Sequence, residues 1–227
     1  MLYLIGLGLD VEGISQQGLK AVNKCEKVYL EFYTIDFPYL KEDLEKTLNK
    51  KVILADRDIV ESLKIVEEAK DKDIALLVYG SPLIATTHIS LIQEAEKQNI
   101  KVKIIHNASI FDAVAETGLQ PYKFGKTTSI PNFKAESFTE VIKDNLSIGA
   151  HSLVLVDMGM EFGGALERLK GVDIDKLVVC SALGTKNSKI YYEKLDKLKN
   201  KKIERPFCLI VPGKLHFIEE EMLMRYI

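Results

Sequence analysis

The residues of this 227-residue chain that could do chemistry lie where short apolar runs end. The first are two glycines, Gly6 and Gly8, at the end of the apolar run 2–7. A dinucleotide-binding fingerprint needs glycine at the first, third and sixth positions of such a turn, and the sixth position here is Val11. An acidic residue closing the second strand, the weaker part of the fingerprint, is present as Glu31. We therefore interpret the turn as a βα turn where a ligand can approach the backbone without a Cβ in the way, and not as a dinucleotide site.

Hydroxyl and imidazole side chains follow two further apolar runs. Ser81 precedes Pro82, which predicts a helix that Ser81 caps and Pro82 opens, with His88 in its first turns. Ser109 is a second expected N-cap. Helix starts expose free N–H groups that suit a carboxylate ligand, so two of them after strands of one sheet predict a ligand site. Capping alone explains the same residues, and this alternative stays open.

The last candidate segment is Val211-Pro212-Gly213-Lys214-Leu215-His216, where a lysine and a histidine beside a turn could face an anionic substrate. Proline and glycine also fit turn chemistry alone. Lys123-Phe124-Gly125-Lys126 places two cations around a glycine, a pattern typical of a solvated edge. No metal-ligand spacing and no acid–base or nucleophile motif appears, even among the four histidines, His88, His106, His151 and His216.

Short β-branched runs alternate with amphipathic stretches, which predicts an α/β fold. The expected strands are 2–7, 27–32, 51–54, 74–79, 101–105, 122–129, 152–157, 176–182 and 207–211. The expected helices are 15–24, 39–48, 59–70, 84–98, 109–116, 135–145, 164–170, 189–198 and 215–226. We expect two α/β domains, residues 1–107 with a largely parallel sheet and residues 108–227 with a mixed sheet. A small ligand would occupy the cleft between them.

Composition excludes some classes of protein. The formal net charge of −2 argues against a generic nucleic-acid binder, which would carry a basic surface. Three cysteines without CxxC spacing, Cys25, Cys180 and Cys208, fit a reducing compartment and predict neither a disulfide framework nor a metal site. No basic leader and no apolar run near the ~20 residues of a membrane span is present, so we expect a cytoplasmic protein with no membrane partner.

Taken in order along the chain, the motifs resemble the diphthine synthase family of the tetrapyrrole-methylase-like superfamily. The glycine turn alone would fit any relative in that superfamily, whereas EFYT, ATTH and PGKLH narrow the resemblance to this branch. It spans essentially the whole chain. The matching segments are LYLIGLGL at 2–9, EFYT at 31–34, ATTH at 85–88, Ser109-Ile110, YKFGK at 122–126 and VPGKLH at 211–216.

The resemblance implies two tetrapyrrole-methylase-like domains, S-adenosylmethionine in the cleft between them, and a homodimer. It implies a methyltransferase that acts on the amino group of 3-amino-3-carboxypropyl-histidine in translation elongation factor 2, a step of diphthamide biosynthesis. It assigns no catalytic residue. The cofactor contacts carried over by motif are Leu9, Ser81, Ile84, Ser109, Ile110, Val156, Ala182, Leu183 and His216.

Two departures from the family pattern bear on these expectations. Ser81 stands where the family usually has Asp, so a lost charge could weaken cofactor affinity by ~1–3 kcal/mol. The chain is also short between Asp157 and Lys176, which affects the expected substrate side more than the cofactor site. Two alternatives remain: a sibling methyltransferase acting on a corrin precursor or ribosomal RNA, and a non-catalytic cofactor-binding scaffold.

Overall fold

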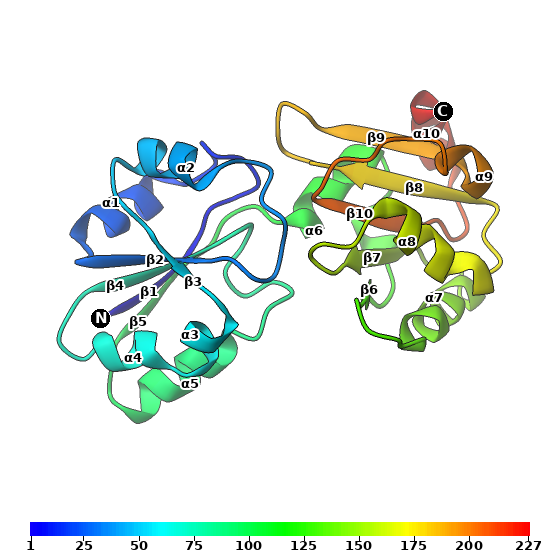
Figure 1. Ribbon diagram of the computed structural model, residues 1–227. Coiled ribbons are helices and arrows are strands. Elements are labelled where there is room, and N and C mark those ends of the chain that lie inside the picture. Colours follow the sequence, from blue (N-terminus) through cyan, green and yellow to red (C-terminus); the bar gives the residue numbers. More distant parts are fainter. The chain divides into compact units, whose positions relative to one another are not determined.

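The structure, a computed structural model, describes all residues from Met1 to Ile227. The chain forms two compact units, Met1–Ile110 and Phe111–Ile227 (Figure 1). Each unit contains its own five-stranded sheet with helices packed on it. The α/β prediction, with a parallel sheet followed by a mixed sheet, is confirmed.

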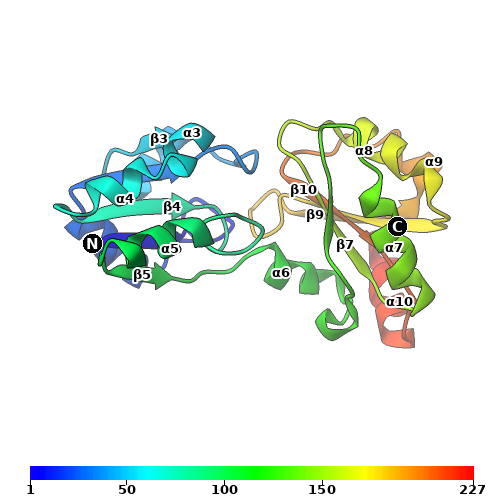
Figure 2. The same ribbon diagram turned by 90° about the horizontal axis from the view of Figure 1, so that it is seen from below.

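The sheet of the first unit is parallel throughout, in the order β3-β2-β4-β1-β5. The arrowheads of β4 and β5 point the same way in Figure 2. The strands are β1 (Leu2–Gly6), β2 (Lys27–Glu31), β3 (Ile53–Ala55), β4 (Ile74–Val78) and β5 (Val102–Ile105). The helices are α1 (Gln16–Lys24), α2 (Lys41–Leu48), α3 (Arg57–Glu61), α4 (Lys64–Glu68) and α5 (Ile89–Lys97).

Both faces of this sheet are buried, which explains why its strands are almost continuously apolar. Tyr3 and Ile5 of β1 belong to the apolar cluster under α1 and α2. Leu2 and Leu4 belong to the opposite cluster, under α3, α4 and α5. Figure 1 shows α1 and α2 on one side of the strands and the other three helices on the other side. Because successive side chains of β1 point to opposite faces of the sheet, this strand contributes to the apolar clusters on both sides.

The sheet of the second unit is mixed, in the order β6-β7-β10-β8-β9. Only β6 and β7 are parallel, and the other pairs are antiparallel. The strands are β6 (Thr128–Ile130), β7 (Ser152–Val156), β8 (Lys176–Ser181), β9 (Lys189–Lys194) and β10 (Phe207–Val211). The α-helices are α6 (Ile110–Ala113), α7 (Ser137–Ser147), α8 (Phe162–Arg168), α9 (Leu195–Leu198) and α10 (Phe217–Leu223). Single 3₁₀ turns occupy Val114–Thr117, Pro121–Lys123, Leu169–Gly171 and Met224–Tyr226.

Four predicted elements differ from the structure. The stretch 189–198, expected to be one helix, is strand β9 followed by the short helix α9, because all six residues of β9 pair with β8. The expected helix 59–70 is split into α3 and α4 at Leu63, whose φ is 63°. The expected strand 122–129 is reduced to β6, and the expected helix 84–98 begins only at Ile89.

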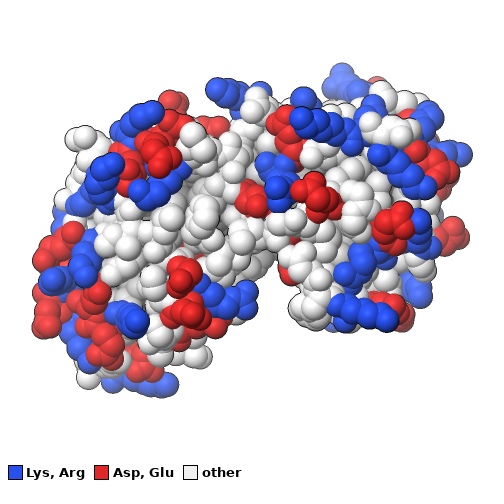
Figure 3. All heavy atoms as spheres, in the orientation of Figure 1, with Lys and Arg blue, Asp and Glu red and all other residues white.

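On the face shown in Figure 3, Lys and Arg are interspersed with Asp and Glu over both units, with uncharged surface between them. No helix of either unit is both long and apolar enough to cross a membrane.

Candidate functional site

The first part of the candidate site is the carboxyl edge of the parallel sheet in the first unit. The backbones of Gly8 and Gly80, just beyond β1 and β4, exchange two hydrogen bonds of 3.1 and 2.9 Å. Leu9 and Ser81 follow this bridge directly, and both are buried. The Tyr79 hydroxyl donates to the Leu9 carbonyl oxygen at 2.9 Å. Two predicted cofactor residues are thus held together by main-chain pairing.

The two glycines of the first turn have a different role from the one expected. A Cβ on Gly6 would lie 2.6 Å from the Gly80 carbonyl oxygen, so protein and not ligand occupies that space. Gly8 has φ +75°, a conformation that L side chains rarely adopt. Asn107, which the sequence reasoning missed, donates from Nδ2 to the carbonyl oxygens of Gly6 at 3.1 Å and Gly13 at 2.9 Å. Its position just after β5 was the signal that could have identified it.

Ser109 lies at the same edge, beyond the end of β5. A Cβ built on Gly80 would be 3.6 Å from the Ser109 Cα, so the two segments are in van der Waals range. Ser109 is buried and immediately precedes α6, which Ile110 begins. Ile84 is 40% exposed and closes a turn with Ser81 through its N–H, at 3.2 Å. The structure therefore brings Leu9, Ser81 and Ser109 together and presents an apolar side chain near them.

The segment between Ser81 and His88 is a turn and not the expected helix start. Ser81 and Pro82 do not open a helix, since α5 begins at Ile89 with His88 as its N-cap residue. Ala85 has φ +54°, in the left-handed region, which stops a helix from running through it. His88 is 1% exposed, and its Nδ1 lies 3.1 Å from the Pro82 carbonyl oxygen. Burial lowers the pKa of His88, although the bond to Pro82 and the charge of Glu31 act in the opposite direction.

Glu31 is fully buried at the end of β2 and organises the turn of the EFYT motif. Its carboxylate accepts hydrogen bonds from the Tyr33 N–H at 3.0 Å and the Thr34 Oγ1 at 2.7 Å. Burial raises the pKa of Tyr33 to about 12. Glu31 is the acidic residue that a dinucleotide-binding fingerprint would use to bind ribose. Its carboxylate already has protein partners, which suits a structural role.

In the second unit, three of the predicted cofactor residues lie at one edge of the mixed sheet. Val156 ends β7, and Ala182 and Leu183 follow β8. Both strands run antiparallel to β10, so their carboxyl ends share an edge. Ala182 and Leu183 are buried, and the Ala182 N–H donates to the Pro206 carbonyl oxygen at 2.8 Å.

His216 lies beyond the opposite edge of that sheet. Strand β10 runs the other way and ends with Val211 paired to Ser152, the first residue of β7. His216 then caps α10, where its Nδ1 accepts a hydrogen bond from the Ile218 N–H at 3.4 Å. Within this unit, the structure therefore does not bring His216 beside Val156 and Ala182.

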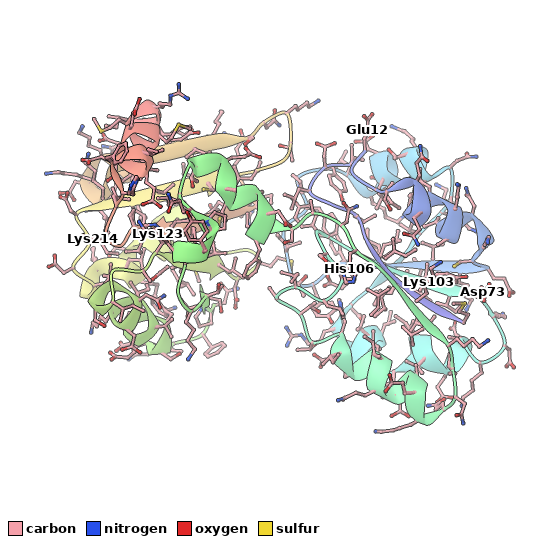
Figure 4. All side chains as sticks on the ribbon, turned by 180° about the vertical axis from the view of Figure 1, so that it is seen from behind. Glu12, Asp73, Lys103, His106, Lys123 and Lys214 are labelled. Atoms are coloured by element: carbon pink, nitrogen blue, oxygen red, sulfur yellow. The ribbon has the colours of Figure 1, made fainter.

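A buried ionic network ties down the segment that carries Lys214 and His216. The Glu219 carboxylate has no exposed surface. It accepts hydrogen bonds from the backbone N–H groups of Gln120 at 3.0 Å and His216 at 2.7 Å. It also forms a close ion pair with Lys123, whose Nζ donates to the Lys214 carbonyl oxygen at 2.7 Å as well. Figure 4 shows Lys123 and Lys214 near one another in this unit.

The fourth partner of Glu219 is His151, a buried side chain 3.2 Å from it through Nε2. The Gly213 N–H donates to His151 Nδ1 at 2.9 Å, so Nδ1 carries no proton and Nε2–H donates to Glu219. Burial lowers the pKa of His151, which favours this neutral form. Burial alone would raise the pKa of Glu219, but the hydrogen bonds, first among them that of Lys123, lower it to about 2. The YKFGK and PGKLH motifs are joined by this network.

Comparison with known proteins identifies the family of this chain. The family model for tetrapyrrole (corrin/porphyrin) methylases matches residues 1–199. A diphthine synthase of Methanococcus maripaludis is 40% identical over 248 residues, covering 98% of this chain and 97% of that protein. A diphthine methyl ester synthase of Schizosaccharomyces pombe is 48% identical over 165 residues, covering 70% of this chain and 58% of that protein. A crystal structure of diphthine synthase matches with a TM-score of 0.93 and 36% identity, covering 99% of this chain and 95% of that one. The chain therefore belongs to the tetrapyrrole methylase family and, within it, to the diphthine synthases.

Proposed function

We propose that this methyltransferase uses S-adenosylmethionine to methylate the amino group of 3-amino-3-carboxypropyl-histidine in translation elongation factor 2, a step of diphthamide biosynthesis. The observation that carries the proposal is similarity over 98% of the chain to a protein named diphthine synthase. The gathering of Leu9, Ser81 and Ser109 at one sheet edge supports it, because ligands of open α/β sheets bind at the carboxyl ends of strands.

The side chains at this edge fit a nucleoside-containing cofactor. Ser81 and Ser109 are buried hydroxyl groups, suited to hydrogen bonds with ribose or amino-acid atoms. Ile84 presents an exposed apolar side chain to pack on a base. When bound, S-adenosylmethionine supplies an already activated methyl group on sulfur. The proposed contacts of the second unit are Val156, Ala182 and Leu183 at one edge of its sheet and His216 beyond the opposite edge, and Ile110 joins those of the first unit.

The reaction needs orientation more than proton transfer. An α-amino group has a pKa of about 7.7–8.0, so a useful fraction of the acceptor is already neutral near pH 7. A dedicated base could gain little more than about 1.4 kcal/mol, whereas in-line positioning can supply several times that amount. We therefore assign the chain the tasks of binding, orienting and excluding water, and name no residue as a base.

Lys214 is the proposed partner of the acceptor's carboxylate. Its side chain is exposed, while its backbone is fixed by hydrogen bonds from its own N–H to the Gly149 carbonyl oxygen at 3.0 Å and from Lys123 Nζ. A fixed backbone combined with an exposed ammonium group makes Lys214 suited to recognise a carboxylate. We expect Lys214→Ala to raise the KM for the elongation factor at least tenfold while leaving cofactor affinity unchanged. Unchanged methylation of the factor would contradict this role.

Labelled S-adenosylmethionine incubated with unmethylated elongation factor 2 tests the function. Label on the factor supports the proposal, and mass spectrometry of the product counts the methyl groups and reports whether nitrogen or carboxylate oxygen carries them. Label only on a corrin precursor or RNA favours the sibling methyltransferase. Binding without transfer favours a scaffold, an alternative that the serine at position 81 encourages.

Two further properties belong to the proposal. We propose a homodimer, which sedimentation velocity of the purified chain would test. We also propose that the protein acts in the cytoplasm, the compartment of its proposed protein substrate, and fractionation of cells would test this.

A further inference from the structure

His88 is a buried imidazole that makes one hydrogen bond. Its Nδ1 lies 3.1 Å from the Pro82 carbonyl oxygen, which can only accept, so Nδ1 carries the proton. Its Nε2 is buried and has no hydrogen-bond partner. Leaving a buried polar atom unpaired costs free energy, and the bond to Pro82 is the one hydrogen bond of the ring that offsets this cost.

The hydrogen bond from His88 contacts the peptide group between Pro82 and Leu83, and the orientation of this group decides the type of the neighbouring turn. Residues 81–84 form a turn closed by the Ile84 N–H and the Ser81 carbonyl oxygen. In such a turn the central peptide, here between Pro82 and Leu83, can point in two opposite directions. The type II direction requires a positive φ at the third residue, and Leu83 does not have one. Leu83 itself thus favours the type I direction, and the hydrogen bond from His88 adds a restraint on the Pro82 carbonyl in that direction.

Ala85, between this turn and His88, is in an unfavourable backbone conformation. Its φ of +54° lies in the left-handed region, which glycine adopts readily and a residue with a Cβ does not. Non-glycine residues keep such a conformation where the surrounding structure imposes it. The bond from His88 to Pro82 joins the chain on both sides of Ala85 and is a restraint of this kind.

We propose that His88 is a positioning residue of the cofactor site. Through the Pro82 carbonyl it fixes the turn that presents the Ser81 hydroxyl and the Ile84 side chain. The inference rests on the proposed function, since it takes these two side chains as contacts of S-adenosylmethionine. It gives the histidine of the ATTH motif a role that does not require it to touch the cofactor or the substrate.

Two substitutions distinguish the contributions of the two ring nitrogens of His88. His88→Asn places an amide N–H near the position of Nδ1 and can restore the bond to Pro82, whereas His88→Gln places it near Nε2 and cannot. By titration calorimetry we expect Asn to keep the Kd for S-adenosylmethionine within threefold of the wild type and Gln to raise it at least tenfold. With the elongation factor as substrate, Gln should raise the KM for S-adenosylmethionine and change kcat at saturation less than threefold.

Ser90→Ala is the matched control, because it removes a hydrogen bond of the same segment, from Ser90 Oγ to the Thr87 carbonyl oxygen at 3.0 Å, without touching the turn. It should bind like the wild type. If His88→Gln does not fold, His88→Ala takes its place, since it also lacks a donor at the Nδ1 position.

The outcomes distinguish this inference from the function on which it rests. Equal cofactor affinities for the Asn variant and for the variant that lacks the donor would overturn the positioning role. So would weaker binding in the Ser90 control. If the wild type binds S-adenosylmethionine but transfers nothing to the elongation factor, the proposed substrate is wrong and the calorimetric comparison still decides the role of His88. If the wild type does not bind S-adenosylmethionine, both proposals are refuted.

Discussion

Replacing Glu219 by Gln tests the buried network of the second unit, because the amide keeps the shape of the side chain and loses its charge. Glu219 accepts the Gln120 N–H on one carboxylate oxygen and the His216 N–H on the other, so the single carbonyl oxygen of glutamine can keep only one of these two bonds, and its NH2 group faces the other N–H. The ion pair with Lys123 is lost, and the ammonium group is left three-quarters buried without a counter-charge. The substitution therefore removes the charge together with an acceptor, and only the pH-dependent part of its effect reports the charge.

The pKa of Glu219 sets the magnitude of the effect. A carboxyl group whose pKa falls from 4.5 to about 2 on folding contributes about 3 kcal/mol to the free energy of unfolding at neutral pH. Because the folded-state pKa is the lower one, this contribution is present above pH 4.5 and is lost as the pH falls towards 2. By pH 3, roughly 2 kcal/mol of it is lost. We expect Glu219→Gln to be at least about 3 kcal/mol less stable than the wild type at pH 7, and we expect this difference to shrink by about 2 kcal/mol by pH 3.

Urea denaturation at pH 7, 5, 4 and 3, followed by circular dichroism of both proteins, measures this difference. Glu140→Gln is the control, because Glu140 pairs with Lys143 on an exposed helix face at 3.5 Å. It should cost less than about 0.5 kcal/mol, with little dependence on pH. A stability difference for Glu219→Gln that stays constant from pH 7 to pH 3 would refute the electrostatic reasoning, and so would a difference below about 1 kcal/mol at pH 7.

Three further substitutions follow from the geometry. Ser81→Asp introduces the residue that the resemblance to the family leads us to expect here, and we expect tighter S-adenosylmethionine binding by ~1–3 kcal/mol in calorimetry; an unchanged Kd would show that no charge is needed at this position. Gly6→Ala would place its Cβ 2.6 Å from the Gly80 carbonyl oxygen, so we expect a loss of about 1–3 kcal/mol in urea denaturation, and wild-type stability would contradict the close approach. Ala182 has φ 48°, so Ala182→Gly should stabilise the chain by about 1 kcal/mol and raise the Tm by about 2–4 °C; a lower Tm in calorimetric scans would disprove it.

Local patterns in the sequence were sufficient to predict most of the helices and strands and to identify the family. The apolar runs of β1 and β4, with amphipathic stretches between them, predicted a parallel sheet because hydrophobic periodicity is a property of neighbouring residues. The Ser15 cap of α1 was predictable for the same reason, and its side chain accepts from the Gly18 N–H at 3.0 Å. The order of short motifs, each weak alone, was enough to identify the branch of the family.

The differences arise where a partner far along the chain decides the outcome. The stretch 189–194 has charged residues at helix-compatible positions, and only pairing with β8 makes it a strand. Gly6 looked open to a ligand because the residue that fills the space, Gly80, is far from it in sequence. Local propensity cannot anticipate such contacts, because tertiary packing overrides it.

The candidate site shows the same division between short-range sequence patterns and long-range contacts. By itself the sequence determined the strand ends, the turns and the polar residues beside them, since these depend on residue types a few positions apart. Only the tertiary structure joined Lys123 to Glu219, across 96 positions, and set His216 at the opposite edge of the sheet from Val156 by reversing β10. Strand direction and long-range contacts are fixed by how whole elements pack, and no short stretch of the chain encodes them alone.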